Sequence, residues 1–397
     1  MNNEIKLTIP KYLDSFQCMG GDCSDTCCRG WNVYIDKRTY KKYRNLNTSD
    51  LGNRLAKYIC KNKQSTRDGD YAYIQLDKGQ CPFLTSTCRC EIQEKVGHSY
   101  LSKTCQTYPR QLIKIGDEYE MTAGMSCPVI AEQVLLGKNP FLLIQKEIRS
   151  NEFSGLALSQ NLKEDEVSKK IRTFFIKVVQ DSRFSFQERL ILVVMFAHAI
   201  ATEKSVEMEQ FLSESSVLLS SPNLKEEVSG LRNFASVNQA LKNFVKISKK
   251  QISSGNELNV FILMLNESLK GLSFERKQDV SNFAKDRLVI QKTSDGKYID
   301  QILENYTIHY LMQEIKSYTP ERVMSYVEQL LVRISFFKVL WFGLNENFGE
   351  VSAEQLIQTV QKFTKNYEHS QAFKDSMTLI FEDLDEVQLT DYLALII

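Results

Sequence analysis

The stretch FQCMGGDCSDTCCRGW, residues 16–31, decides how the first third of the chain is interpreted, because it holds four cysteines and a Gly-Gly turn. A second stretch, CPFLTSTCRCEIQEKVGHSYLSKTCQTYPR (81–110), holds four more, and MSCPVI (125–130) holds the last. Thiolates are soft ligands that suit zinc, copper(I) or iron–sulfur clusters, and a bound metal lowers their pKa. Glycines let a backbone turn tightly around a metal. The sequence therefore predicts an N-terminal metal domain built from cysteines.

The distribution of cysteines argues against disulfides. All 10 lie between Cys18 and Cys127, although the chain has 397 residues. Disulfides that stabilised the whole protein would be spread along it, and they are disfavoured in the cytoplasm. The set is therefore interpreted as metal ligands or redox groups, with Cys60 and Cys88 as the members best explained as plain packed thiols.

The spacing of the first four cysteines distinguishes between kinds of metal site. It is not the paired C-x2-C pattern of zinc ribbons. It also lacks the C-x3-C-x2-C loop of radical-SAM enzymes, because Gly30 stands where the third cysteine would follow Cys23 and Cys27. Adjacent side chains diverge, so Cys27 and Cys28 do not suit one tetrahedral zinc. A larger iron–sulfur cluster, or two separate roles for these cysteines, accommodates them more easily, and zinc is the alternative.

Composition sets the class of protein. A hydrophobic fraction of 43%, a charged fraction of 25% and a net charge of +1 are ordinary for a soluble globular chain. The charge balance gives no case for binding nucleic acid. No apolar run approaches the roughly 20 residues that span a bilayer, and no secretory leader is visible at the start. We expect a cytoplasmic protein without a transmembrane segment.

Periodicity divides the chain into a cysteine-rich metal domain over residues 1–136 and a helical domain over 137–397. The expected fold is α-rich, with a small irregular α+β part, and the metal domain is docked on an all-α body. Short strands are predicted at Tyr71–Leu76 and on both sides of Gly116-Asp117, and two helical segments between Thr39 and Tyr58. Helices are predicted by three- and four-residue spacing over Val167–Val179, Phe186–Ala201, Val206–Leu219, Leu231–Ile252, Leu258–Leu272, Ile299–Tyr318, Glu321–Leu344 and Ala353–Phe381.

The cysteine segments resemble a known family, the flagellin lysine-N-methylases called FliB proteins, which belong to a wider group with a zinc- or iron-chelating cysteine domain. The matching pieces are CSDTCCRGWNVYID (23–36), CPFL (81–84), CEIQEKVG (90–97), LSKTCQTYPR (101–110) and MSCPVIAEQVLL (125–136). Shorter pieces, ENYTIHYL (304–311) and YEHS (367–370), occur in the helical part. The resemblance is dense over the first 136 residues and rests on short segments beyond them.

The resemblance implies a function and a set of site residues. The family transfers methyl groups from S-adenosylmethionine (SAM) to flagellin lysines and uses a [4Fe–4S] cluster. The favoured cluster ligands are Cys28, Cys81, Cys90 and Cys105. Cys27 comes next, as a ligand or as a thiolate that accepts the methyl group before the lysine does. The remaining metal candidates are Cys18, Cys23 and Cys127.

Groups outside the cysteine set complete the expectations. No βαβ unit with a Gly-rich loop is readable, so a SAM site must be built in another way. Arg110 could bind the carboxylate of SAM, and Trp31 could form an aromatic wall with Tyr34 and Tyr40. Lysine methylation needs a neutral amine, so the site must desolvate the lysine or offer a base. Glu368 and His369 are the candidates for that base, and a structural hydrogen-bonding role is the alternative for His369.

Two other classes of function stay open at the level of sequence. One is a non-catalytic zinc- or iron-binding protein with a helical interaction domain. The other is an electron-transfer protein, which would explain a cluster but would give the helical body no task. The ENY and EHS segments of that body favour the methyltransferase.

Overall fold

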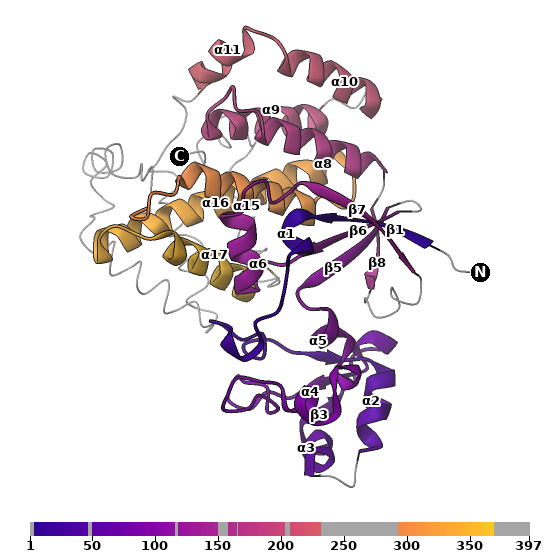
Figure 1. Ribbon diagram of the computed structural model, residues 1–397. Coiled ribbons are helices and arrows are strands. Elements are labelled where there is room, and N and C mark those ends of the chain that lie inside the picture. Colours follow the sequence, from indigo (N-terminus) through magenta and orange to yellow (C-terminus); the bar gives the residue numbers. More distant parts are fainter. Residues whose placement is uncertain are drawn as a thin grey trace. The chain divides into compact units, whose positions relative to one another are not determined.

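The computed structural model describes residues 4–46, 50–115, 118–149, 158–164, 166–202, 207–231 and 293–368 (Figure 1). The chain forms two compact units. The first comprises Met1–Ala131 and Leu142–Lys163, and the second Glu132–Phe141 and Glu164–Ile397. The domain boundary expected after residue 136 would separate two parts that fold independently. That boundary stays a prediction.

A five-stranded mixed sheet dominates the first unit, with the strand order β7-β1-β6-β5-β8 (Figure 1). Its strands are β1 (Glu4–Pro10), β5 (Arg110–Ile115), β6 (Glu118–Ala123), β7 (Leu143–Arg149) and β8 (Leu158–Glu164). β5 and β6 pair antiparallel, which confirms the strands predicted on both sides of Gly116-Asp117. β1 runs parallel to β6 and antiparallel to β7.

Two of these strands correct the sequence-based prediction. The chain was expected to be helical from about Ile130 and all-α from residue 137, but β7 and β8 lie beyond that point. β7 pairs with β1 along its whole length, from Glu4 opposite Arg149 to Pro10 opposite Leu143. Pairing with a distant strand, not local propensity, therefore sets its conformation.

A three-stranded sheet with the order β2-β4-β3 supports the cysteine loops. β4 (Ala72–Ile74) confirms the predicted strand, and it lies between β2 (Tyr34–Ile35) and β3 (Ile59–Lys61). α2 (Lys37–Arg44) and α3 (Asp50–Tyr58) are the two predicted helices, and the Thr39 amide donates to the Asp36 carboxylate over 2.9 Å at the start of α2. The buried core includes Ile35, Leu55 and Ile74, and Cys28 and Cys90 pack against it.

The remaining elements of the N-terminal region are short. They are α1 (Lys11–Asp14), the 3-10 turns η1 (Gly20–Asp22), η2 (Asp68–Asp70) and η3 (His98–Tyr100), and the helices α4 (Glu91–Val96), α5 (Lys103–Thr107) and α6 (Pro128–Leu135). Most cysteines are therefore carried by turns and by the ends of short helices.

The second unit contains a helical body, as expected. Among the described residues of this unit, the helices are α8 (Glu166–Val179), α9 (Phe186–Thr202), α10 (Met208–Leu219), α11 (Leu224–Leu231), α15 (Ile299–Glu314), α16 (Pro320–Phe348) and α17 (Ala353–Tyr367). α9 packs on α8 and α16, and α8 packs on α15. Thr319 caps α16, and Pro320 occupies its first turn, as predicted. The helices predicted at Leu231–Ile252 (beyond Leu231) and Leu258–Leu272 lie outside the described residues, as does Ala353–Phe381 beyond 368.

The most apolar helix forms part of this core. The run Leu190–Val194 in α9 is fully buried. None of the helices that the structure describes is long and apolar enough to cross a bilayer.

Candidate metal centre

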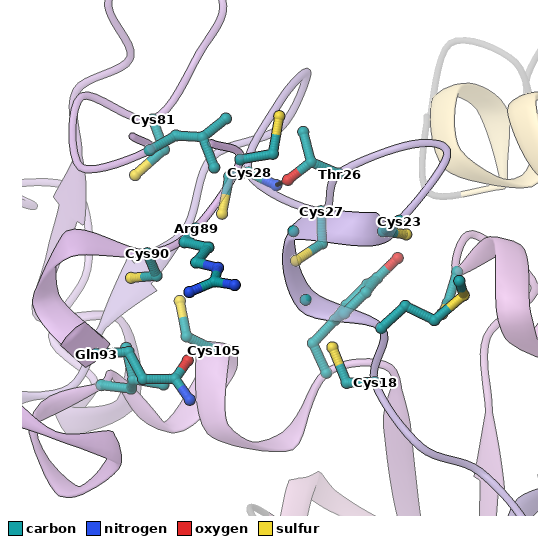
Figure 2. Close-up of a pocket in the computed structure, with 18 of the residues that line it drawn as sticks. Cys18, Cys23, Thr26, Cys27, Cys28, Cys81, Arg89, Cys90, Gln93 and Cys105 are labelled. Carbon is teal, nitrogen blue, oxygen red and sulfur yellow. Dashed lines mark hydrogen bonds between the residues drawn. The ribbon is translucent and has the colours of Figure 1, made fainter. Parts of the chain in front are cut away.

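A cavity of about 450 Å³ lies within the first unit, and nine of the ten cysteines line it (Figure 2). They are Cys18, Cys23, Cys27, Cys28, Cys81, Cys88, Cys90, Cys105 and Cys127. The volume falls within the range of about 300–1,000 Å³ that is typical of small-molecule and cofactor sites. All eight cysteines that the sequence singled out as ligands or methyl acceptors therefore meet in one place. Cys88, which was expected to be a plain packed thiol, joins them.

Backbone hydrogen bonds between distant loops bring the cysteines together. The Cys81 amide donates to the Cys28 carbonyl over 2.8 Å, and the Gly30 amide donates to the Gly79 carbonyl over 3.0 Å. The Glu91 amide donates to the Phe83 carbonyl over 2.8 Å, so the chain turns back at Cys88 and places Cys90 beside Cys81. These bonds connect the cysteine loops to one another.

Cys105 enters the cavity from α5. The Ser102 hydroxyl accepts from the Cys105 amide over 3.1 Å and caps this helix. Figure 2 shows the sulfurs of Cys28, Cys81, Cys90 and Cys105 around one part of the cavity, with Cys27, Cys18 and Cys23 beyond them. These four are the cysteines that the sequence analysis favours as ligands.

The pKa values of several of these thiols are raised above the ordinary value. A hydrogen bond with the Cys28 thiol, together with burial, raises the pKa of both Cys27 and Cys81 above the ordinary value. Burial raises the pKa of Cys105 to about 12 and also raises that of Cys90. Several thiols in so small a space ionise together only when a positive charge joins them, which is the environment that a metal provides. The chemistry of the donors, which are soft thiols, suits a thiolate-bound metal group.

A metal itself stays a proposal. Within the described part of the chain, no group of three or more Cys, His, Asp or Glu side chains is arranged so that it could hold a metal ion.

Cys60, which was expected to be uninvolved, lies on β3, where its thiol donates to Gln75 over 3.3 Å. His98 lies in η3 and does not line the cavity.

The two residues predicted to bind SAM take different positions. Trp31 lines the cavity, its indole Nε1 donates to the Cys27 carbonyl over 2.7 Å, and its ring lies 5.7 Å from that of Tyr108. Arg110 begins β5 and is not among the lining residues. Its guanidinium lies 4.8 Å from the centre of the Phe16 ring, where burial lowers its pKa, with Cys18 and Cys127 acting in the opposite direction.

The aromatic wall differs from the expected one. Tyr34 and Tyr40 do not line the cavity, and Tyr40 packs on Tyr71 with ring centres 5.2 Å apart. Tyr108 takes their place beside Trp31. Tyr108 and Arg89 were missed by sequence reasoning, although each lies within three residues of a cysteine, and that proximity was the signal available.

Glu368, a candidate base, lies in the helical unit directly after α17. The Tyr306 hydroxyl donates to its Oε1 over 3.4 Å. Burial raises the pKa of Glu368 to about 7, and the Arg333 guanidinium acts in the opposite direction. The ENY and EHS segments, more than 60 residues apart, therefore meet through Tyr306 and Glu368. His369 lies outside the described residues.

Comparisons with known proteins identify the family. The FliB lysine N-methylase C-terminal domain matches residues 172–396, which is more than half of the chain. The chain belongs to the FliB lysine N-methylase family.

Individual relatives are distant. A lysine-N-methylase of Salmonella typhimurium is 25% identical over 193 residues, which cover 49% of this chain and 47% of that protein. The flagellar biosynthetic protein FliU of Salmonella muenchen is 28% identical over 144 residues, which cover 36% of this chain and 85% of FliU. The chain thus spans about half the length of the lysine-N-methylases that it matches. No solved structure is similar to it.

Proposed function

We propose that this protein is a SAM-dependent N-methyltransferase that acts on lysine side chains of flagellin. The observation that carries the proposal is the match of the FliB lysine N-methylase C-terminal domain to residues 172–396. The thiol-lined cavity of the first unit supports it, because it gathers the cysteines of the family pattern around a space of cofactor size.

The net reaction defines what the residues must do. The lysine Nζ forms a bond to the methyl carbon as the bond from that carbon to the donor sulfur breaks, and S-adenosylhomocysteine leaves. The amine must lose a proton before or during the attack, so a base of suitable pKa is needed near neutral pH. Glu368, with its pKa raised to about 7, has that property. We propose Glu368 as this base, together with His369.

The cysteines have a separate role in the proposal. Cys28, Cys81, Cys90 and Cys105 would hold a [4Fe–4S] cluster, with Cys18, Cys23 and Cys127 as the other candidates and zinc as the alternative metal. A bound cluster would supply a Lewis-acidic and redox-active centre. Trp31, which lines the cavity, would offer an aromatic face to the adenine ring, whereas Arg110, the other residue expected from the sequence to bind SAM, is not among the lining residues.

Cys27 is the candidate for a methyl relay. In that route a Cys27 S–CH3 bond forms while the donor S–CH3 bond breaks, and the lysine amine then takes the methyl group as the Cys27 sulfur leaves as a thiolate. Single-turnover labelling with methyl-labelled SAM, followed by mass spectrometry of the protein, distinguishes the routes. A methylated Cys27 that forms and then decays supports the relay, whereas direct transfer leaves Cys27 unlabelled.

The decisive experiment is anaerobic purification with metal and sulfide analysis, followed by incubation with SAM and flagellin. We expect iron and sulfide in a ratio near that of a cubane, about four of each per chain, and a mass increase on flagellin lysines. One zinc per chain, with no methylated lysine, would instead indicate a non-catalytic metal-binding protein with a helical interaction domain.

A further inference from the structure

Two oppositely charged side chains in the cavity wall have no part in the proposed ligand set. Arg89 and Glu94 lie on either side of Cys90 in the sequence, and both line the cavity. Arg89 Nη1 lies 3.8 Å from Glu94 Oε1, and the two side chains are 66% and 43% exposed. An ion pair this long and this exposed contributes little to the free energy of folding. The pair is therefore open to a ligand.

The backbone below Arg89 is fixed. The Thr85 amide donates to the Arg89 carbonyl over 2.8 Å, and the Arg89 amide donates to the Thr85 hydroxyl over 3.1 Å. A Cβ atom at Gly21 would lie 3.2 Å from Arg89 Cγ, so the stem of Arg89 rests on the η1 turn. Figure 2 shows its guanidinium reaching over the cavity. The structure thus directs this side chain into the cavity.

The charged side chains that line the cavity indicate what kind of ligand it binds. Among the described residues that line the cavity, Arg89 has the one permanently cationic side chain, while Asp22, Asp25 and Glu94 carry carboxylates. A guanidinium binds a carboxylate through two parallel hydrogen bonds. The head group of an α-amino acid carries a carboxylate and an ammonium side by side, so it complements an arginine next to a glutamate.

We propose that Arg89 and Glu94 bind the amino-acid head group of SAM, with its carboxylate on Arg89 and its ammonium on Glu94. This inference rests on the proposed function, because it takes SAM as the methyl donor. The Trp31–Tyr108 pair lines the same cavity and faces the adenosine part of the donor. Arg110 lies over Phe16, outside the lining, so Arg89 is the better partner for the carboxylate.

The test measures binding without turnover. The full-length protein, loaded with its metal, is titrated calorimetrically with S-adenosylhomocysteine and with 5′-methylthioadenosine, which lacks the amino-acid head group. We expect Arg89→Gln to weaken binding of S-adenosylhomocysteine about tenfold or more, because a charge-assisted bidentate contact is lost. Binding of 5′-methylthioadenosine should be unchanged. Arg67→Gln is the matched control, because Arg67 pairs with Asp70 and does not line the cavity.

Each other outcome overturns the inference. Unchanged binding of S-adenosylhomocysteine by Arg89→Gln would do so, and an equal loss for both ligands would mean that Arg89 only shapes the cavity. A selective loss in Arg110→Lys but not in Arg89→Gln would assign the head group to Arg110. If the unmodified protein binds neither SAM nor S-adenosylhomocysteine, the proposed donor itself is wrong, and this result is obtained before any variant is made. Metal content, measured for every variant, shows whether the cavity has stayed intact.

Discussion

Among single residues, Cys28 connects most of the proposed ligand set. Its thiol is hydrogen-bonded with those of Cys27 and Cys81, and its proximity also raises the pKa of Cys90 and Cys105. Its carbonyl also accepts from the Cys81 amide, so the two loops are fixed to each other at this point. Cys28 is therefore the position where losing a thiol should affect a bound metal most.

We predict that Cys28→Ser lowers the bound metal of the anaerobically purified protein to background. A neutral hydroxyl replaces one of the thiolates that a cluster requires. The measurement is metal and sulfide per chain, with circular dichroism to show that the fold is kept. Cys60→Ser is the control and should bind as much metal as the unmodified protein, because Cys60 lies on β3 outside the cavity. If Cys60→Ser loses the metal while Cys28→Ser keeps it, the ligand set is wrong.

Glu368 gives a second prediction at this scale. Burial raises its pKa to about 7, and the nearby Glu314 adds to the effect, while Arg333 and the hydrogen bond from Tyr306 oppose it. Because the folded protein keeps this proton more tightly than the unfolded chain does, the stability that the protonated carboxyl confers is full below pH about 4.5 and is lost as pH rises to about 7.

Two measurements follow for Glu368→Gln. Thermal unfolding at pH 8 should show a variant as stable as the unmodified protein or more stable, by about 1–3 kcal/mol, because no buried charge must form. Methyl transfer should fall about 100-fold, the contribution typical of a general base, and should lose its rise through pH 7. A variant that keeps the original pH profile would remove Glu368 from the proposed mechanism.

At the scale of elements, the cavity depends on two turns that touch. A Cβ atom at Gly21, in η1, would lie 2.7 Å from the Thr87 carbonyl oxygen in the turn before Cys88. Real Cβ atoms do not approach backbone so closely, and a backbone atom cannot move aside as a flexible side chain can. One of the two turns would have to shift.

We therefore predict that Gly21→Ala lowers stability by about 1–3 kcal/mol and reduces bound metal, because it separates the Cys18–Cys28 loop from the turn that carries Cys88 and Cys90. Gly69→Ala is the matched control, because a Cβ atom there would meet nothing within 4 Å. Thermal unfolding and metal analysis of both variants provide the comparison. If the two variants have the same stability and the same bound metal, the close contact between the two turns is not needed for either property.

The elements also show what local sequence can and cannot predict. α8, α9 and α16 were predicted because apolar residues at spacings of three and four mark a helix that buries one face. β7 was missed because Leu143 is exposed and the strand has no buried face to set an alternating pattern; its structure depends on β1. The gathering of the cysteines was foreseeable from their clustering. Their grouping around Cys28 was not, because hydrogen bonds between loops decide it.

For the whole molecule, the two units depend on the proposed metal to different degrees. The helical unit has its own core, in which Leu192, Val194 and Phe337 are fully buried. The first unit places nine thiols around a cavity. Its small core, with Ile35 and Ile74, lies on the sheet below the loops. A metal that binds only the folded state stabilises what it holds, so the loops should benefit most.

Removal of the metal should therefore increase local opening in the cysteine loops and leave the helical unit unchanged. After iron is removed anaerobically with ferricyanide and EDTA, we expect amide hydrogen exchange to accelerate in residues 16–31 and 81–110. Exchange in α9 and α16 should stay unchanged, because their amides are protected by helical packing that involves no thiol. Acceleration throughout both helices would mean that the units unfold together. No change in the cysteine loops would mean that backbone bonds such as that from Cys81 to Cys28 hold them without a metal, and the cavity would then be a site that is preformed for its ligand.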